Sequence, residues 1–481
     1  MYRLRRRAIY LRQKEESPMK KTAIASLTLA AALTLAACSG NNAGTNNNVS
    51  PSPAGADPSP APTENTGNGG SKLSGDVVFW SMWSDTEPQA KVIQTAVKAF
   101  ETANPDVKVN VKFTGREINK LIKPALDGGE AIDIFEGDPA NAISSLKDHL
   151  LKLDEYVGQP SIGMDGKTVE QSLLPSLMSW TKSLSVAAGL EEGYYALPQQ
   201  PFAVLFFYNK EVFEKAGVTT PPTTWDEFMS ANEKIKQSGV DPITFDDAYR
   251  DLFIGGYLSS AMGHEWVDQL VNDKTGDMWK DPIVLQFAND IVTMREKGYF
   301  SKKIAGSKYP AGQQDLVLGQ SAAYLNGTWL PNEVSATAGP DFKWGAFQFP
   351  TIPNGNGKGG HKELTFGAQA LMLNKKSGNK EAAMELVKYL IGKSAQEGMV
   401  QQAQAIPATV DTEWPAALAE ASAAMDRAEL NQPWGAGINN NADLAMSTII
   451  PVFMELVSGK MTAEEYVAKM SAEAKKFHSA G

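Results

Sequence analysis

Three short runs of β-branched and aromatic residues open the folded part of the chain, at residues 76–80, 107–113 and 131–135. In the second run, valine or phenylalanine alternates strictly with polar residues, which is typical of a strand with one buried face. The two stretches between the runs carry apolar residues at helical spacing. The order strand, helix, strand, helix, strand predicts a mainly parallel sheet and places the chain in the α/β class.

The ends of the first two helices can also be predicted. Pro88 suits the first turn of a helix that ends at Asn104-Pro105, and Gly128-Gly129 caps a second helix over residues 116–126. Further along, the pattern predicts strands at 193–209, 322–329 and 366–374, a helix through Phe213, a capped helix start at 223–228, and helices from Ala416 onward with a kink at Pro451 inside 442–457.

The N-terminal segment has the pattern of a secretory leader. Met19-Lys20-Lys21 precedes an apolar run that ends in Leu35-Ala36-Ala37-Cys38, as a lipobox does. The run is too short for a typical membrane-spanning helix. We expect residues 1–37 to be removed and Cys38 to be lipidated, with palmitate among its acyl chains, which would anchor the protein to the outer face of the cell membrane. Residues 1–18 precede a complete leader, and we interpret them as a spurious extension from an upstream start codon.

Residues 38–72 consist almost entirely of Asn, Gly, Ser, Thr, Pro and Ala. Such a segment buries too little apolar surface to fold, so we expect a disordered tether of roughly 30 Å root-mean-square length. Anchor, tether and globular body then follow in that order.

Charge and cysteine content exclude several classes of protein. The whole chain carries a net charge of −10, and removal of the leader takes away eight Lys or Arg and two Glu, which leaves −16. This charge argues against nucleic acid binding. The single cysteine excludes an intrachain disulfide and a Cys-based metal site. The four histidines lie far apart in sequence, so we expect no metal site and no cofactor.

Six segments, taken in order, carry a resemblance to a known family. They are VVFWSMWSD, AIDIFEGDP, YALPQQPFAVLFFYNKEVFEKAGV, AAYLNGTWLP, FGAQALMLNKKSGNKEAAMELVKYL and MTAEEYVAKM. With these segments the chain resembles the family 1 extracellular solute-binding proteins, which include the maltodextrin-binding proteins. The resemblance spans residues 72–477. The resemblance implies a type II periplasmic-binding-protein fold, with two α/β lobes joined by a hinge and a ligand cleft between them.

The resemblance also implies boundaries and partners. The first lobe would comprise residues 73–200 and 364–404, and the second lobe residues 201–363 and 405–481, with chain crossings near Gln200, Glu363 and Gln404. Such a protein is a monomer that binds a small sugar, delivers it to the permease of an ABC importer with a cytoplasmic ATPase, and uses no cofactor.

Polar and aromatic residues follow the first and third predicted strands. In parallel sheets, ligands bind beyond the carboxyl ends of the strands. We therefore expect ligand contacts from Trp83, Asp85 and Glu87, and from Glu136 and Asp138. The alternatives are core packing for Trp83 and solvated loop carboxylates for the acidic residues, whereas we expect Trp80, within its strand, to belong to the core.

The resemblance adds candidates elsewhere in the chain. Trp329 in the Asn326-Gly327-Thr328-Trp329 motif matches a position where the family stacks a sugar ring on an aromatic side chain. The other candidates are Asn326, Gln199 and Gln200 at the first crossing, Asp246, Tyr249 and Trp434 in second-lobe loops, and Gly367. Relatives often have a glycine pair where this chain has Gly367-Ala368, which puts the backbone contact there in doubt.

Three other functions stay open at this point. A carbohydrate-cleaving enzyme also uses paired carboxylates, but Glu136 and Asp138 are neighbours two apart, and the chain has no GxSxG, P-loop or HExxH motif. A receptor that presents its ligand to a sensor kinase, and a binding protein for a non-sugar solute, would carry the same fold. The many aromatic residues favour a sugar, and an oligosaccharide in particular.

Overall fold

The computed structural model describes residues 72–480, and residues 70–481 form one compact unit. The predicted leader at 1–37, the predicted lipidation site Cys38 and nearly all of the tether predicted at 38–72 lie outside the described residues.

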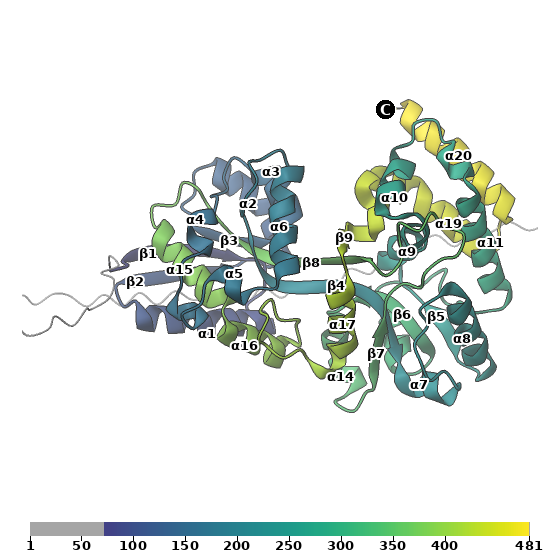
Figure 1. Ribbon diagram of the computed structural model, residues 1–481, viewed down its shortest axis with the longest axis horizontal. Coiled ribbons are helices and arrows are strands. Elements are labelled where there is room, and N and C mark those ends of the chain that lie inside the picture. Colours follow the sequence, from purple (N-terminus) through teal and green to yellow (C-terminus); the bar gives the residue numbers. More distant parts are fainter. Residues whose placement is uncertain (1–71, 481) are drawn as a thin grey trace, which may run out of the picture. The chain divides into compact units, whose positions relative to one another are not determined.

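The first lobe contains the strand and helix alternation that the sequence predicts (Figure 1). Its elements are β1 (Gly75–Ser81), α1 (Pro88–Ala103), β2 (Val107–Phe113), α2 (Ile118–Asp127) and β3 (Ile134–Gly137). Strand β1 lies in the middle and pairs in parallel with both β2 and β3, which confirms the predicted parallel sheet. Proline at the start of α1 agrees with the expected helix start.

The strands predicted at 131–135, 193–209 and 366–374 have wrong bounds, because the structure has them at Ile134–Gly137, Leu197–Asn209 and Glu363–Leu373. The strand predicted to end at Phe135 continues to Gly137, because its antiparallel partner β8 (Glu363–Leu373) pairs with it as far as that residue. Glu136 therefore lies inside a strand rather than in the loop after it. The first-lobe sheet is thus mixed, with a parallel part at β1, β2 and β3 and an antiparallel part at β8.

Helices cover the first-lobe sheet (Figure 1). Helix α1 packs against α15 (Lys380–Ile391) and α16 (Lys393–Ala403), and α3 (Pro139–Leu146) packs against α6 (Pro175–Ala187) and β8. Two single-turn helices complete this lobe, α4 (Asp154–Val157) and α5 (Val169–Ser172).

Strand β4 (Leu197–Asn209) takes part in both sheets. Its first half pairs antiparallel with β8, through Ala203 opposite Phe366. From Val204 onward it pairs with β6 (Ser321–Gly327) and then with β7 (Trp344–Phe347). Strand β5 (Asp241–Thr244) runs parallel to β6 at the edge of the second-lobe sheet. One continuous strand thus links the sheets of the two lobes.

Helix α8 (Trp225–Gln237) starts as the sequence predicts. The Thr224 side chain accepts a hydrogen bond from the backbone N–H of Glu227, and the Glu227 carboxylate accepts one from the backbone N–H of Thr224. This is a complete capping box. The other second-lobe helices are α7 (Lys210–Lys215), α9 (Arg250–Met262), α10 (His264–Asn272), α11 (Pro282–Glu296), α12 (Ala311–Val317), α13 (Leu330–Glu333), α14 (Ser335–Ala338), α17 (Ala419–Arg427), α18 (Ala442–Leu444), α19 (Ile450–Val457) and α20 (Ala463–Ala480).

The C-terminal part is less uniformly helical than predicted. A short strand, β9 (Leu430–Gln432), pairs with the start of β8, and an irregular segment, Trp434–Asn441, follows it. The helix predicted around Pro451 contains a π-type turn at Ala445–Ile449, just before that proline. Proline has no N–H to donate to the preceding turn, so a widened turn is a natural accommodation.

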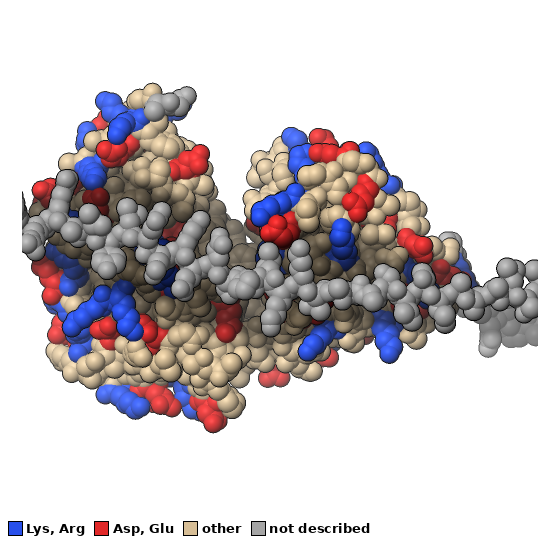
Figure 2. Space-filling model, turned by 180° about the vertical axis from the view of Figure 1, so that it is seen from behind, with Lys and Arg blue, Asp and Glu red and all other residues tan. Residues whose placement is uncertain are grey.

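Among residues 72–480, no helix is long and apolar enough to cross a membrane. Acidic and basic side chains are interspersed on the face that Figure 2 shows, outside the grey residues.

Trp80 gives the clearest test of the first-lobe core. It is 3% exposed, and its β-sheet neighbours are Lys112 and Phe135. The ammonium of Lys112 lies 3.5 Å from the ring centroid, so this cation covers one face of the buried indole. This agrees with the core role expected for Trp80.

We predict that Trp80→Ala lowers the free energy of unfolding by about 3–5 kcal/mol, because it empties a buried aromatic position. Urea denaturation followed by far-UV circular dichroism measures this loss. Trp80→Phe, which keeps most of the ring volume, should cost clearly less. A loss below about 1 kcal/mol for the alanine variant would show that the indole does not contribute substantially to the stability of the core.

Candidate functional site

A cavity of about 460 Å³ is lined by side chains from both lobes. Its volume is in the range typical of small-molecule sites. The lining residues are Met82, Trp83, Glu87, Pro88, Gln89, Arg116, Asp138, Gln200, Pro201, Phe202, Thr328, Trp329, Asn332, Glu333, Gln369, Ala403, Gln404, Ala405, Ile406 and Trp434. We call this space the central cavity.

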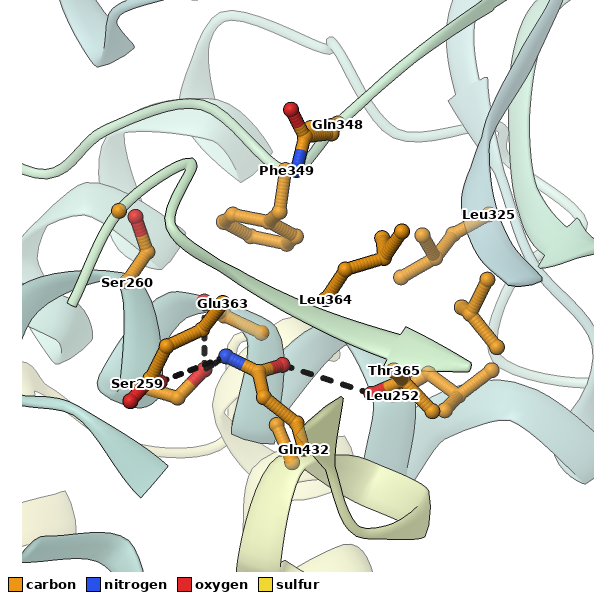
Figure 3. A pocket seen from close by; sticks show the side chains of 14 residues that line it. Leu252, Ser259, Ser260, Leu325, Gln348, Phe349, Glu363, Leu364, Thr365 and Gln432 are labelled. Carbon is orange, nitrogen blue, oxygen red and sulfur yellow. Dashed lines mark hydrogen bonds between the residues drawn. The ribbon is translucent and has the colours of Figure 1, made fainter. Parts of the chain in front are cut away.

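A second cavity, lined in part by residues of β8 and β9, is too small for a sugar. It measures about 40 Å³, room for about one or two water molecules. Its polar groups already bind one another: Gln432 donates to the Glu363 carboxylate over 2.8 Å and to the Ser259 hydroxyl over 3.2 Å (Figure 3). The central cavity is therefore the better candidate for ligand binding.

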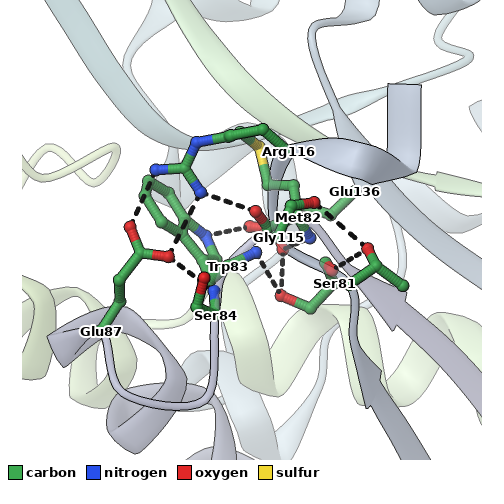
Figure 4. A network of polar contacts seen from close by, with 9 residues as sticks. Ser81, Met82, Trp83, Ser84, Glu87, Gly115, Arg116 and Glu136 are labelled. Carbon is green, nitrogen blue, oxygen red and sulfur yellow. Dashed lines mark hydrogen bonds and ion pairs between the residues drawn. The ribbon is translucent and has the colours of Figure 1, made fainter. Parts of the chain in front are cut away.

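The loop after β1 forms one wall of the central cavity. Trp83 is 6% exposed, and the Arg116 guanidinium lies 4.4 Å from its ring centroid. Arg116 also donates to the backbone oxygen of Met82 over 2.6 Å and to the two carboxylate oxygens of Glu87 over 2.9 and 3.3 Å (Figure 4). We call Trp83, Arg116 and Glu87 the first-lobe wall.

A buried carboxylate lies behind this wall. Glu136 is 1% exposed, and its Oε1 accepts a 2.7 Å hydrogen bond from the indole N–H of Trp83. Its Oε2 accepts from the Ser81 hydroxyl over 2.7 Å and from the backbone N–H of Met82 over 3.2 Å (Figure 4). Burial raises the pKa of Glu136 to about 7, although these hydrogen bonds favour the charged form.

Asp138 stands at the end of β3 and at the start of α3. Its Oδ1 accepts from the backbone N–H of Ala140 over 2.9 Å, as an N-cap side chain does, and Pro139 occupies the first helical turn. Its Oδ2 accepts from the amide of Asn141 over 2.8 Å. Burial raises the pKa of this carboxyl. The residue lines the cavity while it also caps a helix.

Three aromatic rings gather on the second-lobe side. Trp329 and Trp434 lie nearly parallel, with centroids 6.1 Å apart and an angle of 19° between their planes. Phe202 on β4 lies 5.7 Å from Trp329 and 6.4 Å from Trp434. Both tryptophans keep part of their surface exposed. The three rings form an aromatic cluster beside the cavity, the second-lobe cluster.

Local backbone geometry fixes the two tryptophans. A Cβ atom on Gly327 would come within 2.2 Å of the Trp329 ring, so only glycine lets this ring fold back over the end of β6. Gly435 and Gly437, which follow Trp434, have φ values of 65° and 98°, which glycine adopts without strain. Gly255 on α9 allows the carbonyl of Gly435 to approach closely. The glycine of the NGTW motif therefore has a packing role.

The floor of the cavity includes two neighbouring amides. Gln200 on β4 is opposite Gln369 on β8, next to an irregularity in pairing between Pro198 and Gln200. The side-chain oxygens of both glutamines are buried without a hydrogen-bond partner among the described residues. Such acceptors are costly when unpaired. They are consequently available to a ligand that donates hydrogen bonds.

Six of the predicted site residues line the central cavity: Trp83, Glu87, Asp138, Gln200, Trp329 and Trp434. They come from five distant parts of the sequence. Their contact with a ligand stays a prediction.

Seven predicted site residues do not line the cavity. Asp85 is exposed at the surface, and Gln199 is fully buried in β4 beneath its neighbour Gln200. Glu136 and Tyr249 lie one layer behind the cavity, each next to the side chain of a lining tryptophan, Trp83 for Glu136 and Trp329 for Tyr249. The remaining three are Asp246, Asn326 and Gly367.

These last three residues have structural partners. Asp246 accepts hydrogen bonds from Ser307, Gly312 and Tyr324, over 2.5 to 3.0 Å. Asn326 is fully buried and accepts from the backbone N–H of Gly327 over 2.7 Å.

Gly367 faces the rings of Phe202 and Trp180, which a Cβ atom would approach to about 2.9 and 3.2 Å. Its close approach is to aromatic side chains, and no backbone contact to the cavity is formed there. Neither loop position nor resemblance to the family could have shown that Gly367 does not line the cavity.

Several lining residues were not predicted. Arg116 follows β2, the one parallel strand of the first lobe whose carboxyl end received no candidate, although the rule for parallel sheets applies to it equally. Asn332 and Glu333 are three and four residues beyond Trp329, on the helix that this tryptophan precedes. Burial raises the pKa of the Glu333 carboxyl, although the residue keeps an exposed side. The segment 403–406, where the resemblance implies a chain crossing near Gln404, was not predicted to line the cavity.

Within residues 72–480, no three His, Cys, Asp or Glu side chains are grouped so that they could hold a metal ion.

Known proteins resemble this chain along most of its globular part. A model of the bacterial extracellular solute-binding protein family matches residues 83–397. The chain is 24% identical over 313 residues to a binding protein of Brucella abortus, across 64% of this chain and 71% of the relative. It is 23% identical over 331 residues to the multiple sugar-binding protein of Streptococcus mutans, across 66% of this chain and 71% of the relative.

A solved structure supports the same fold. A chitin oligosaccharide binding protein has a TM-score of 0.62 at 22% identity and covers 85% of this chain and 100% of its own. Likeness at this identity concerns the fold, and it confirms the expected two-lobed α/β architecture. Because the family model covers more than half of the sequence, from the loop after β1 into α16, the chain belongs to the bacterial extracellular solute-binding proteins.

Proposed function

We propose that this protein captures an oligosaccharide in the central cavity and delivers it to the permease of an ABC importer. The observation that carries the proposal is the placement of tryptophans from both lobes, Trp83 on one side and Trp329 with Trp434 on the other, around one cavity that also contains unpaired acceptors.

The two kinds of group match the two surfaces of a sugar. Each ring has C–H faces that pack on aromatic rings, and the exposed parts of Trp329 and Trp434 suit that contact. Each ring also carries hydroxyls, which donate to amide and carboxylate oxygens. Gln200, Gln369 and Glu333 supply such oxygens at the cavity. The cavity volume of about 460 Å³ lies in the range of sites that enclose drug-sized ligands, which suits an oligosaccharide.

Relatives support the ligand class. The Streptococcus mutans relative is named as a multiple sugar-binding protein, and the solved neighbour as a chitin oligosaccharide binding protein. Relatives are solute-binding proteins and not enzymes. Glu136 and Asp138, the carboxylate pair that suggested a hydrolase, hold Trp83 and cap α3 respectively.

Closure of the two lobes would complete the site. A ligand that contacts both lobes binds the closed form more tightly and shifts the population toward it. In this proposal the lobes are residues 73–200 with 364–404 and residues 201–363 with 405–481, and β4 with β8 forms part of the link between them. The closed monomer would then dock on the permease, whose ATPase acts on the inner side of the membrane.

We place the protein on the outer face of the cell membrane, held through a lipidated Cys38 and the tether at residues 38–72. The family is extracellular, which agrees with export. Delivery to a sensor kinase instead of a permease, or a non-sugar ligand, would use the same fold. The ligand screen below discriminates between a sugar and a non-sugar ligand.

The ligand class is tested by a thermal-shift screen of residues 70–481 against di- and trisaccharides including chitotriose, and against monosaccharides, polyols, amino acids and polyamines. We expect a rise of several degrees with one oligosaccharide series, because a ligand at a hundredfold excess over its Kd adds about 2.7 kcal/mol to the folded state. A rise with another class of solute, and none with any sugar, would overturn the proposed ligand.

Trp329→Ala should weaken binding of the sugar identified in that screen at least tenfold, because about 1.4 kcal/mol of stacking is lost. Isothermal titration calorimetry measures the affinity, and the thermal midpoint of the ligand-free protein should change little. Trp80→Ala, with the opposite pattern of lost stability and retained affinity, is the matched control. Gly327→Ala should weaken binding as well, since it displaces the Trp329 ring. Unchanged affinity in both variants would remove Trp329 from the site.

Cys38→Ser should release the protein from the membrane, because a serine cannot form the thioether that carries the lipid. Metabolic labelling with radioactive palmitate and fractionation of cells measure this, and the native chain is the labelled, membrane-bound control. A Cys38→Ser protein that stays labelled and membrane-bound would contradict the lipid anchor.

A further inference from the structure

The first-lobe wall rests on the carboxylate of Glu136, which does not itself line the central cavity. Its Oε1 lies 2.7 Å from the indole nitrogen of Trp83, which does line that cavity. The Arg116 guanidinium in turn lies 4.4 Å from the centroid of the Trp83 ring. Arg116 also donates hydrogen bonds to both carboxylate oxygens of Glu87.

From this geometry we infer that Glu136 is a positioning residue, whose carboxylate fixes the Trp83 indole and, through it, Arg116 and Glu87 as the first-lobe wall of the ligand cavity (Figure 4). The inference rests on the proposed function of that cavity. It gives a role to a carboxylate that the sequence suggested as a direct ligand contact.

Trp83 could not be held in the same way by its other neighbours. Its backbone N–H donates to the Ser81 hydroxyl over 3.3 Å, and its carbonyl accepts from the N–H of Gly115 over 3.1 Å. Both bonds fix the main chain only. The indole rotates about two side-chain bonds, and its single polar atom is the N–H that Glu136 accepts. Removal of that acceptor therefore takes away the one side-chain hydrogen bond that fixes the orientation of the ring, and leaves only its packing against Arg116 and the core.

A buried charge at this position is costly, which argues that it is retained for more than packing. Glu136 faces Leu371 of β8 on one side and the Ser81 and Trp83 side chains on the other. Arg116 is the charged group that favours its ionised form. Three donors converge on the carboxylate, and charge-assisted bonds of this kind are roughly twice as strong as neutral ones.

The same geometry predicts a dependence on pH. Burial raises the pKa of Glu136 to about 7, so the carboxylate is ionised above that pH and protonated below it. A protonated carboxyl keeps one good acceptor oxygen for three donors, so the bond to Trp83 weakens as the pH falls. The wall, and any affinity that depends on it, should be strongest above pH 7.

The first test uses residues 70–481 without ligand. The indole N–H resonance of Trp83, identified by its loss in Trp83→Phe, is followed by 1H–15N NMR between pH 5.5 and 8.5. We expect it to titrate with a midpoint near 7 in the native protein and to lose this titration in Glu136→Gln. A resonance that titrates equally in Glu136→Gln would overturn the inference, and one that does not move with pH in the native protein would overturn its pH dependence.

The second test measures the affinity for chitotriose. We expect Glu136→Gln to weaken binding about three- to tenfold at pH 8. We also expect the affinity of the variant to lack the part of the pH dependence that the titration of Glu136 causes in the native protein. Asp138 and Glu333, whose pKa values burial also raises, are present in both proteins and cancel in this comparison. In the Trp83→Phe background, Glu136→Gln should have no further effect, since it acts through the indole N–H.

Asp133→Asn is the matched control. Asp133 is another buried first-lobe carboxylate, 6% exposed, which accepts from the backbone N–H of Val78 over 2.8 Å and from the Ser377 hydroxyl over 2.5 Å. It lies before β3, at the opposite end of that strand from the cavity. Its loss should lower stability but leave the Trp83 titration and the affinity unchanged.

The outcomes separate this inference from the proposed function. A lower thermal midpoint in Glu136→Gln with native affinity would mean that Glu136 only stabilises the fold, and would overturn the positioning role. A Trp83 resonance that titrates as expected, in a protein that binds no saccharide, would support the control of the wall by Glu136 and overturn the proposed ligand class. Loss of affinity equal in Asp133→Asn and Glu136→Gln would also overturn the positioning role.

Discussion

The antiparallel pairing of β4 with β8 is the constraint on which the rest of the structure depends. Residues of β4 up to Ala203 pair with β8, and from Val204 the same strand pairs with β6. One strand therefore fixes the register of both sheets. Apart from the irregularity between Pro198 and Gln200, the register is continuous. Because a one-residue slip would reverse which side chains are buried, this pairing sets which loops of the two lobes can meet.

The cavity is a consequence of that arrangement. Loops from the carboxyl ends of β1 and β3 line it from the first lobe, and the turn after β6 lines it from the second. Gln200 and Gln369, opposite each other on β4 and β8, lie on its floor. The site is thus composed of segments that are distant in sequence and are spread from Met82 to Trp434.

Two layers can be distinguished around the cavity. The inner layer offers aromatic surface and acceptor oxygens, and the outer layer holds the inner one in place. Glu136 binds Trp83, Tyr249 adjoins Trp329, and Gly327 makes room for the same Trp329 ring. A large flat side chain such as tryptophan suits a ligand only if its ring is oriented, so in the proposed function the outer layer would contribute to recognition without contact.

The sequence by itself determined the α/β class, the first three strands and their helices, the capping box at Thr224 and the family, because these depend on local periodicity, helix ends and the order of segments. Trp329 and Trp434 could be placed near the site by resemblance. Only the tertiary structure decided that β3 extends to Gly137, that Glu136 faces inward to Trp83, and that Arg116 and Glu333 reach the cavity. A one-residue difference in a strand reverses the direction of a side chain, and neither strand ends nor distant neighbours are encoded in local pattern.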